Sequence, residues 1–501
     1  MTPTPSPPAF PPPLSDQKID ALRDLAVDWA LANGLVIRAV APGTTGPPLP
    51  HSAVHAPLAL FPSPVPRAAY EHARALQPTF NSLVHAITRD DAFLRNVFGG
   101  MGDVDEFTAR LYRIYCEIKA AGLSEQPISL GVHRSDYLMH RDPETLALDL
   151  QQVELNTIAS SFGCLSTLTT RLHRYLLEKT DFYNDRANVA TLDITADALP
   201  ANGATAAIAG AIARAHTEYL AQGRTADGVV MVVQPGERNA IDQRWIEYEL
   251  IDRHGIKLYR RTLAELQNAS KLVDRELVID TLAGPARISV VYFRAGYGPG
   301  DYPTETEWQA RSLIESSVAV KCPTVAQQLA GAKKVQQILA APGALERFVS
   351  DTDAAALRSC FTGLWSLDAG TPDGDAAYAR ALADPSRYVV KPQREGGGNN
   401  IYGADIPAFL AGLPARERAA YILMELIKPP SMRNVLVRQG AVIRDAEVVS
   451  ELGIYGIWVA KDPDTVLTNE AGGHLLRTKV ASSNEGGVAA GFAVLDSPLL
   501  Y

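Results

Sequence analysis

A lysine followed by three consecutive glycines is the feature of this sequence that most clearly points to chemistry. The segment KPQREGGGNN (391–400) follows a short apolar run. Three glycines let the backbone approach a phosphate chain closely, and their N–H groups can donate to its oxygens. Lys391 adds a positive charge that suits phosphate, whereas Glu395 is compatible with phosphate only if a cation such as Mg²⁺ bridges the two. The segment predicts a phosphate and metal site, with a flexible surface hairpin as the alternative.

The glycine loop matches neither of two common nucleotide motifs. The chain contains no GxxxxGK[ST] sequence, and the three glycines do not form a GxGxxG that opens a helix. A P-loop and a dinucleotide-binding fingerprint are therefore excluded. Any nucleotide site must be of another kind.

A second candidate is QQVELNTIASS (151–161), which has the pattern of a strand. Alternate side chains of a strand share a face, so we expect Gln152, Glu154 and Asn156 to point one way and Val153 to point to the core. Glu154 and Asn156 would give two oxygen ligands, half of a Mg²⁺ site. Considered alone, an edge strand with a polar solvent face is the favoured interpretation.

Three more polar clusters lie at predicted strand ends. QPGERNAIDQRW (234–245) crowds charged side chains at the start of a helix, where carboxylates bind. VVYFRAGYGPGDYP (290–303) ends in an arginine and a tyrosine on a glycine-rich loop. GHLLRTKVASSNEGGVAAG (473–491) has an arginine and a lysine one residue apart, then small residues that suit a mobile lid. A capped surface helix and plain turns are the alternatives.

These clusters need helices and strands to position them. Helical periodicity predicts helices at 15–34, 104–122 and 242–255. Residues 35–66 are rich in proline and predict an irregular segment, and 345–386 predict a helical insert. Strands that alternate with helices are typical of an α/β layer. We expect strands at 128–140, 148–162, 229–235, 256–262, 288–297, 388–393 and 421–427.

Composition sets the outer bounds. A chain of 501 residues is long enough for two or three structural units, and its net charge of −9 with no dense Lys/Arg run argues against a nucleic-acid partner. No apolar run reaches the roughly 18 residues that span a bilayer, so we expect no membrane partner. The proline-rich residues 1–14 predict a disordered tail. Four widely spaced cysteines predict reduced thiols rather than a disulfide framework, namely Cys116, Cys164, Cys322 and Cys360.

Eight segments in the same order resemble the eukaryotic-type glutathione synthetase family. The resemblance covers the chain from about residue 125 to its end, and the set is far more specific than any one member. The segments are RSDY (134–137), ELNT (154–157), ERNAIDQR (237–244), VVYFRAGY (290–297), KCPTVAQQLAGAKKVQQ (321–337), KPQREGGGNNIYG (391–403), ELGIYG (451–456) and GHLLRTK with GGVAAG (473–491).

This resemblance implies an ATP-grasp fold of the α/β class, with an inserted α/β substrate-binding domain and a lid. We expect a helical region and the first part of the core at 15–227, the substrate domain at 228–331, and the rest of the core with the lid at 332–501. It implies ligation of γ-glutamylcysteine and glycine through an acyl phosphate, with ATP as co-substrate, two Mg²⁺ ions per site, a homodimer and a cytoplasmic location. An organellar copy stays open as an alternative.

Site residues follow from the resemblance position by position. The metal ligands it implies are Glu154, Asn156 and Glu395, and the catalytic arginines are Arg134 and Arg477. The ATP contacts are Glu154, Lys333, Lys391, Gly396, Gly397, Gly398, Asn399, Asn400, Tyr402, Met424, Glu425, Leu426, Ile427, Glu451, Lys479 and Glu485. The dipeptide and lid contacts are Arg134, Ile158, Ala159, Ser160, Ser161, Glu237, Arg238, Asn239, Gln243, Arg294, Ala295, Gly296, Tyr297, Arg477, Val488 and Ala489.

Two positions depart from the family pattern, and three different functions stay open beside the expected one. Ala159 stands where the family has serine, and Glu485 where it has aspartate. Relatives that use β-alanine have a bulkier step where this chain has Ala489 and Ala490, so glycine is the expected acceptor and β-alanine the alternative. The chain could also be a ligase for another acid or amine, or an inactive ATP-binding regulatory protein. No residue is assigned as the base that accepts the proton of glycine.

Overall fold

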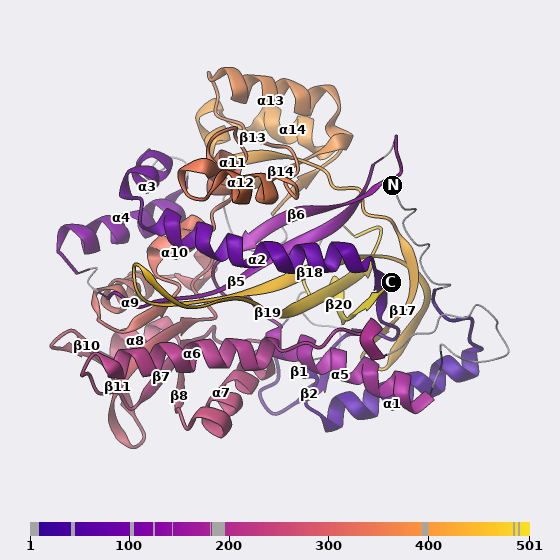
Figure 1. The fold of residues 1–501 in the computed structure, drawn as a ribbon, viewed down its shortest axis with the longest axis horizontal. Coiled ribbons are helices and arrows are strands. Elements are labelled where there is room, and N and C mark those ends of the chain that lie inside the picture. Colours follow the sequence, from indigo (N-terminus) through magenta and orange to yellow (C-terminus); the bar gives the residue numbers. More distant parts are fainter. Residues whose placement is uncertain are drawn as a thin grey trace.

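A central seven-stranded sheet crosses the middle of the molecule in this computed structural model (Figure 1), with strand order β17-β3-β20-β19-β18-β5-β6. The structure describes residues 10–41, 46–100, 105–123, 126–142, 144–180, 182, 196–392, 399–483, 486–488 and 491–501. The strands of this sheet are β3 (Leu58–Ala59), β5 (Ser129–Arg141), β6 (Leu148–Asn156), β17 (Met432–Arg438), β18 (Ala441–Asp462), β19 (Thr465–Val480) and β20 (Ala493–Asp496).

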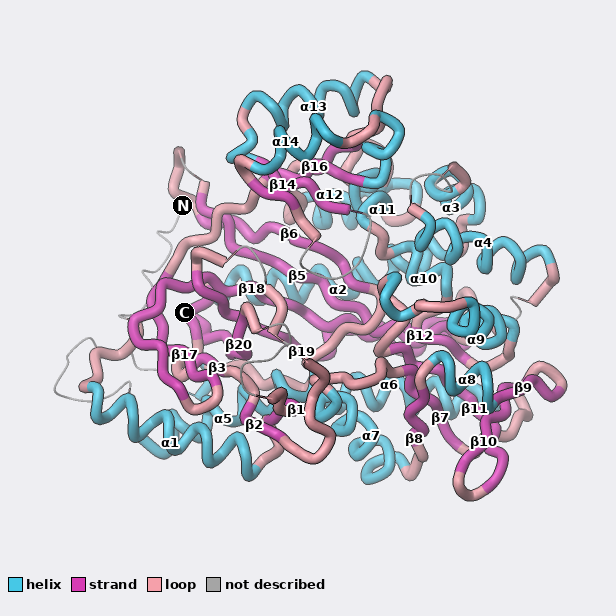
Figure 2. Tube along the Cα trace, turned by 180° about the vertical axis from the view of Figure 1, so that it is seen from behind, coloured by secondary structure: helices cyan, strands magenta, loops and turns pink. Residues whose placement is uncertain are grey.

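Helix α2 (Arg67–Thr88) packs on one face of the central sheet, and the small sheet that contains β14 and β16 lies beside β6. Gly456 of β18 makes room for this helix because a Cβ there would stand 2.1 Å from the Asn81 side-chain oxygen. Figure 2, drawn from behind, shows β5, β6 and β18 passing below the small sheet that contains β14 and β16. The other helices of the first half are α1 (Asp16–Ala32), α3 (Asp91–Phe98), α4 (Glu106–Ala120), α5 (Gly163–Thr180) and α6 (Ala204–Ala221).

A second sheet has the order β8-β7-β11-β10-β9, with β12 paired to β11. Strands β7, β8 and β12 run parallel to β11, so their carboxyl ends meet at one edge, where ligands bind in α/β sheets. The strands are β7 (Gly228–Val232), β8 (Leu258–Arg261), β9 (Ser270–Val273), β10 (Glu276–Thr281), β11 (Gly284–Phe293) and β12 (Val320–Cys322), and the helices α7 (Ala240–His254), α8 (Leu263–Ala269), α9 (Glu305–Ser316) and α10 (Val325–Ala330).

A third, four-stranded sheet has the order β13-β16-β14-β15 and stands at the top of Figure 1. Helices α13 and α14 pack against it through a small hydrophobic cluster of its own. The elements are α11 (Lys333–Leu339), α12 (Asp351–Arg358), β13 (Leu364–Ser366), α13 (Pro372–Ala383), β14 (Tyr388–Pro392), β15 (Ile401–Tyr402), α14 (Asp405–Gly412) and β16 (Tyr421–Glu425).

The mixed α/β class predicted from the sequence is confirmed, with three local differences. Residues 35–66 are not irregular throughout, because they contain β1 (Val36–Arg38), β2 (Ala53–His55), β3 and β4 (Ser63–Val65), the last paired with β21 (Pro498–Leu500). The strand predicted at 148–162 ends at Asn156. Of the tail predicted to be disordered, residues 1–9 lie outside the described residues, but Phe10 and Leu14 pack against the core.

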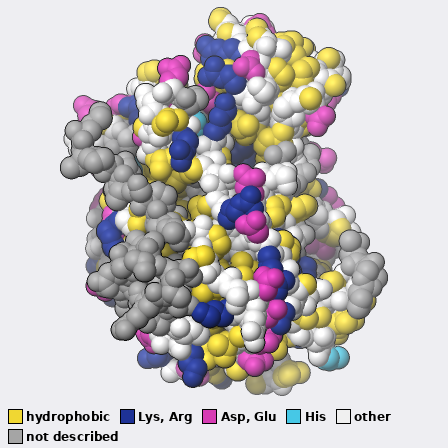
Figure 3. Space-filling model, turned by 90° about the vertical axis from the view of Figure 1, so that its right-hand side faces the viewer, with side chains coloured by type: hydrophobic (Ala, Val, Ile, Leu, Met, Phe, Trp, Pro, Cys, Tyr) yellow, Lys and Arg dark blue, Asp and Glu magenta, His cyan; other side chains and the backbone are white. Residues whose placement is uncertain are grey.

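The surface carries charges of both signs. On the face shown in Figure 3, acidic and basic side chains are interspersed. In the part of the chain that the structure describes, no helix has both the length and the apolar character needed to cross a bilayer.

Candidate active site

A cavity of about 440 Å³ lies between the central sheet and the four-stranded sheet, and it gathers most of the residues expected to contact ATP. Strands β6, β14, β16, β18 and β19 each contribute to its wall. The expected residues that line it are Glu154, Lys333, Lys391, Asn400, Tyr402, Met424, Glu425, Leu426, Ile427, Glu451, Arg477 and Lys479.

One wall of this cavity is apolar and suits an aromatic ring. Val389 of β14 and Met424 of β16 face each other in register, and both pack with Val153 and Ile427. Such a wall is typical of small-molecule pockets, in which a few polar groups fix the orientation of the ligand.

The opposite part of the cavity is strongly charged. Lys333 Nζ lies 2.9 Å from Glu154 Oε2, and Lys391 Nζ donates to the Val153 carbonyl at 3.3 Å. Burial would raise the pKa of Glu154, but the Lys333 and Lys391 ammonium groups outweigh it and hold that pKa below its usual range. Burial lowers the pKa of Lys391 to about 8, and Lys333 acts in the same direction. Two buried ammonium groups in one cavity favour a polyanionic ligand.

The strand that carries Glu154 differs from the sequence-based expectation. The register of β5 and β6 shifts between Asp136 and Tyr137, which pair with Glu154 and Gln152, so the intervening Val153 is an inserted residue. Strict alternation is therefore interrupted at that point. Val153 lines the cavity beside Glu154, and Gln152 does not.

Glu154 and Asn156 fit a hard cation. Asn156 donates through Nδ2 to the Arg134 carbonyl at 3.2 Å and to Asp136 Oδ2 at 3.0 Å, and its amide oxygen, the atom expected to bind the metal, takes no part in these two contacts. Lys333 Nζ donates to Glu154 Oε2 at 2.9 Å. Among the described residues no group of three His, Cys, Asp or Glu side chains could hold a metal ion. Glu154 lines the cavity and Asn156 does not, and the third expected ligand, Glu395, lies outside the described residues, so the set of three oxygen ligands stays a prediction.

The two expected catalytic arginines are joined through a buried aspartate that the sequence did not single out. Arg134 binds Asp136 through Nε and Nη2 at 2.6 and 2.7 Å, and Arg477 Nη2 reaches the same carboxylate at 3.1 Å. Arg477 also pairs with Glu451. Arg477 lines the cavity, whereas Arg134 is 5% exposed and lies beneath it, over the ring of Tyr455.

A second cavity, of about 530 Å³, opens at the carboxyl ends of β7 and β11. Of the expected dipeptide contacts, Glu237, Arg238, Ala295 and Tyr297 line it. The loop that carries Tyr297 is held by Asp301, whose Oδ2 accepts from the N–H groups of Gly296, Tyr297 and Gly298. Gly296 has a φ of +92°, a conformation that favours glycine.

A buried ion pair lies beneath this cavity. Arg294 Nη1 is 3.0 Å from Asp242 Oδ2, and the two side chains are 3% and 0% exposed. Asp242 also accepts from the backbone N–H groups of Phe162, Cys164 and Leu165 at the start of α5. The pair therefore connects β11, α7 and α5, and it fixes the turn that follows β6.

Several buried polar atoms around this pair have no hydrogen-bond partner. They are Asn239 Nδ2 and Oδ1, Gln243 Nε2, Arg294 Nε and Arg260 Nε. Burying such groups unpaired costs about 1–3 kcal/mol each, so a cluster of them indicates a site that a polar ligand completes. The sequence did not single out Arg260, although its position at the end of a predicted strand was the available signal. Burial lowers its pKa to about 10, and nearby Arg244 acts in the same direction.

The segment 158–161 connects β6 to α5 and lines neither cavity, and Ile158 is buried in the hydrophobic core. Ala159 has a φ of +52°, and the Ser161 carbonyl accepts from Arg134 Nη1 and from the Tyr455 hydroxyl. Ser160 donates to the Val132 carbonyl at 3.4 Å. The segment 158–161 therefore connects β6 to α5, and it contacts Arg134 through the Ser161 carbonyl.

Some expected residues are not brought to either cavity. Asn399 is exposed and does not line the ATP-type cavity, and Val488 is buried in the hydrophobic core. Gly486 and Gly487 of the same loop line the cavity instead. Ten further expected residues line neither cavity, namely Arg134, Asn156, Ile158, Ala159, Ser160, Ser161, Asn239, Gln243, Arg294 and Gly296. Six expected residues lie outside the described residues, namely Glu395, Gly396, Gly397, Gly398, Glu485 and Ala489.

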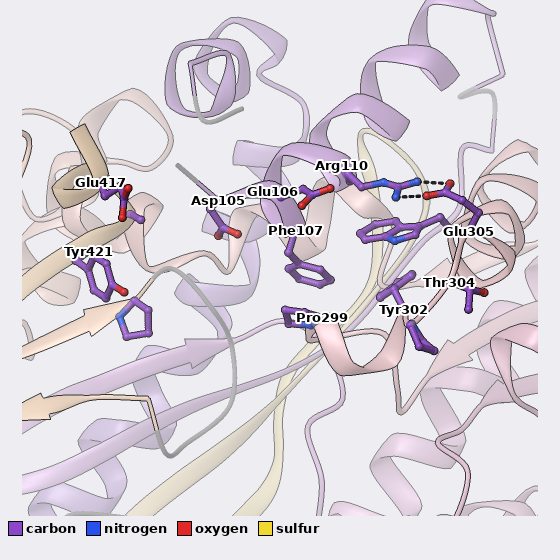
Figure 4. A pocket seen from close by; sticks show the side chains of 14 residues that line it. Asp105, Glu106, Phe107, Arg110, Pro299, Tyr302, Thr304, Glu305, Glu417 and Tyr421 are labelled. Atoms are coloured by element: carbon purple, nitrogen blue, oxygen red, sulfur yellow. Dashed lines mark hydrogen bonds and ion pairs between the residues drawn. The ribbon is translucent and has the colours of Figure 1, made fainter. Parts of the chain in front are cut away.

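A third cavity, of about 560 Å³, contains none of the expected residues (Figure 4). Its charged and aromatic groups satisfy one another, because Arg110 pairs with Glu305 through both terminal nitrogens and lies 4.4 Å from the Trp308 ring. Trp308 in turn stacks on Tyr302 at 4.1 Å.

Comparison with known proteins gives a family match over nearly the whole chain. A family model described as eukaryotic glutathione synthase, ATP binding domain, matches residues 16–500. The glutathione synthetase of Bos taurus is 42% identical over 487 residues, which cover 96% of this chain and 97% of that protein. The chloroplastic glutathione synthetase of Solanum lycopersicum is 42% identical over 491 residues, 97% of this chain and 85% of that protein.

A solved structure shows the same fold. The apo form of a glutathione synthetase-like effector from Globodera pallida superposes with a TM-score of 0.74 and 24% identity, covering 97% of this chain and 98% of that chain. The likeness agrees with the ATP-grasp fold expected from the sequence.

Proposed function

This chain belongs to the eukaryotic glutathione synthase family, and on that premise we propose that it joins γ-glutamylcysteine to glycine in an ATP-dependent reaction. The observation that carries the proposal is the cluster of unpaired buried polar atoms on Asn239, Gln243, Arg260 and Arg294. A dipeptide has an α-amino group, two carboxylates and an amide, which are the complementary partners for such a cluster. The neighbouring cavity with two buried lysines suits the triphosphate.

Within the first cavity, the described residues support a nucleotide in one orientation. Its adenine would lie against Val389, Met424 and Ile427, and its phosphates would extend toward Lys333 and Lys391. The two ammonium groups would balance the negative charge that develops on the transferred phosphoryl group. The glycine loop 396–398 is proposed to cover the phosphates.

Mg²⁺ is the cation that we propose for the oxygen pair of Glu154 and Asn156, with Glu395 as the third ligand. When bound, Mg²⁺ would neutralise phosphate charge and fix the orientation of the triphosphate. The chain itself prepares the site, because Lys333 and Lys391 keep Glu154 ionised and Asp136 fixes the Asn156 amide.

Arg134 and Arg477 are proposed to act on the dipeptide carboxylate that receives the phosphoryl group. Arg477 lies at the wall between Lys479 and Glu451, and Arg134 contacts the carbonyl of Ser161 in the linking segment. Guanidinium groups bind carboxylate and phosphate oxygens in pairs, so they can hold the carboxylate and the resulting acyl phosphate in place. The loop 482–491 is proposed to exclude water from that intermediate.

The remaining features of the proposal concern the whole protein. We propose a homodimer in the cytoplasm, with functional units at 15–227, 228–331 and 332–501. Sedimentation of the purified chain would test the dimer, since a monomer at micromolar concentration would contradict it.

The acceptor assay tests the function. Purified protein with γ-glutamylcysteine, Mg²⁺ and ATP should release ADP far faster with glycine than with β-alanine, and omission of the dipeptide should abolish release. Equal rates with the two acceptors would contradict the preference for glycine, and a faster rate with β-alanine would indicate a homoglutathione synthetase. ADP release that is independent of any amine would instead indicate an ATPase or a regulatory protein.

A further inference from the structure

Asp136 is a buried carboxylate beneath the candidate active site that accepts four hydrogen bonds. It lies in the middle of β5, is 0% exposed, and pairs in register with Glu154 of β6 and Gly453 of β18. Its oxygens accept from Arg134 Nε and Nη2, from Arg477 Nη2 and from Asn156 Nδ2, at distances between 2.6 and 3.1 Å. One side chain therefore touches both arginines and the amide that presents a metal ligand.

The space for this arrangement is provided by a glycine on the adjacent strand. A Cβ on Gly453 would stand 2.6 Å from Asp136 Oδ1 and 2.9 Å from Arg134 Cδ. Real Cβ atoms do not approach so closely, so Gly453 and the Asp136–Arg134 pair require each other. The carboxylate is thereby fixed from three strands at once.

We propose that Asp136 is a positioning residue that couples the metal site to the two arginines; this rests on the proposed function. It does not line either substrate cavity, so its effect is exerted through Asn156, Arg134 and Arg477. By accepting from Asn156 Nδ2 it directs the amide oxygen toward the cation. By holding two guanidinium groups it keeps them from turning to Glu154, its register partner on β6.

The coupling predicts a specific effect of replacing Asp136 by asparagine. Asp136→Asn keeps the shape of the side chain but removes its charge and replaces one acceptor by a donor. The new NH₂ group cannot accept a hydrogen bond, so at least one of the four hydrogen bonds to Asp136 is lost and the others become weaker because the acceptor is no longer charged. Partners behind a metal ligand typically change metal affinity by about 10-fold or more when they are removed.

Manganese binding measured by electron paramagnetic resonance, with a non-hydrolysable ATP analogue present, tests the proposal without turnover. D136N should weaken Mn²⁺ binding about 10-fold and raise the KM for γ-glutamylcysteine about 10-fold, while the KM for ATP at saturating Mg²⁺ changes less than about twofold. A merely structural role would lower stability and leave the Mn²⁺ affinity unchanged.

The matched control is Ser135→Ala, on the same strand with a buried hydroxyl that lacks a partner. It should leave Mn²⁺ binding and both KM values as in the wild type. If D136N does not fold, the charge-balanced variant D136N/R477M should fold and still show weakened Mn²⁺ binding, because in both variants a neutral amide oxygen holds Asn156 Nδ2 more weakly than the carboxylate does.

Wild-type Mn²⁺ affinity in a folded D136N or D136N/R477M protein would overturn the proposal. Its failure is separable from failure of the proposed function, since an inactive wild type with normal Mn²⁺ and nucleotide binding would contradict the function alone.

Discussion

The buried pair of Arg294 and Asp242 allows stability and substrate binding to be separated by substitution. Breaking a buried ion pair by removing one partner costs about 3–5 kcal/mol. Arg294→Met should lie at the lower end, because three backbone N–H groups and the start of α5 still stabilise the Asp242 charge. Asp242→Asn should cost more, because it leaves a 3% exposed guanidinium without its counter-charge.

The double variant D242N/R294M should recover part of the lost stability but not the lost substrate binding. With no unpaired charge left, the remaining loss is one unpaired backbone N–H, about 1–3 kcal/mol, well below the sum of the single costs. Substrate binding should not recover, because Arg294 is absent in both backgrounds. A charged hydrogen bond of roughly 2.7 kcal/mol corresponds to about 100-fold in kcat/KM for γ-glutamylcysteine.

Urea denaturation and initial-rate kinetics on the four proteins give the two readouts. Arg110→Met is the control, since Arg110 pairs with Glu305 in the cavity that holds no expected residue. It should lower stability slightly and leave the dipeptide KM unchanged. Recovery of both stability and dipeptide kinetics in the double variant would show that Arg294 is only a counter-ion, and additive destabilisation would show that the pair is not coupled.

Three further outcomes are expected. Lys391→Met should raise the KM for ATP about 10–100-fold, through loss of a charged phosphate contact, with the dipeptide KM within about twofold; an unchanged ATP KM in initial-rate assays would contradict the phosphate assignment. Burial raises the pKa of Asp496 to about 6, above its unfolded value of about 3.9, so the stability it contributes is lost as pH rises through 6. The stability of D496N relative to wild type should therefore increase by about 1.4 kcal/mol from pH 5 to 7.5, and a difference that is flat with pH in urea denaturation would count against it. Gly453→Ala should cost about 1–3 kcal/mol and reduce turnover while the circular dichroism spectrum is retained; full activity would show that the Asp136–Arg134 pair can shift.

The sequence is sufficient to predict an element where its residue periodicity is clear and its polar residues indicate a site. It predicts the strand before Lys391 at 388–393, which is β14 at Tyr388–Pro392, and a helix at 104–122, which is α4 at Glu106–Ala120. Eleven of the expected ATP contacts come together in one cavity although they are spread from Glu154 to Lys479. The family resemblance supplies that grouping, because spacing alone cannot show which strand ends meet.

The sequence is insufficient where a contact depends on strand register or on a distant partner. The inserted Val153 changes which side chains face the cavity, and nothing in a local alternation pattern marks it. The strand predicted to continue to 162 ends at Asn156. Phe162 has no strand partner there, and its N–H donates instead to Asp242, about 80 residues away. Asp136 belongs to the RSDY motif, but nothing in that motif distinguishes it. Its hydrogen-bond partners come from three strands, with Arg134 on β5, Asn156 on β6 and Arg477 on β19.

The most direct test of ligation through an acyl phosphate follows one oxygen atom. γ-Glutamylcysteine labelled with ¹⁸O in its cysteinyl carboxylate is incubated with the protein, ATP, Mg²⁺ and glycine, and the products are analysed by mass spectrometry. We expect glutathione and inorganic phosphate in equal amounts, with one ¹⁸O atom in each phosphate. Phosphate without ¹⁸O, or ADP release without glutathione, would contradict the account.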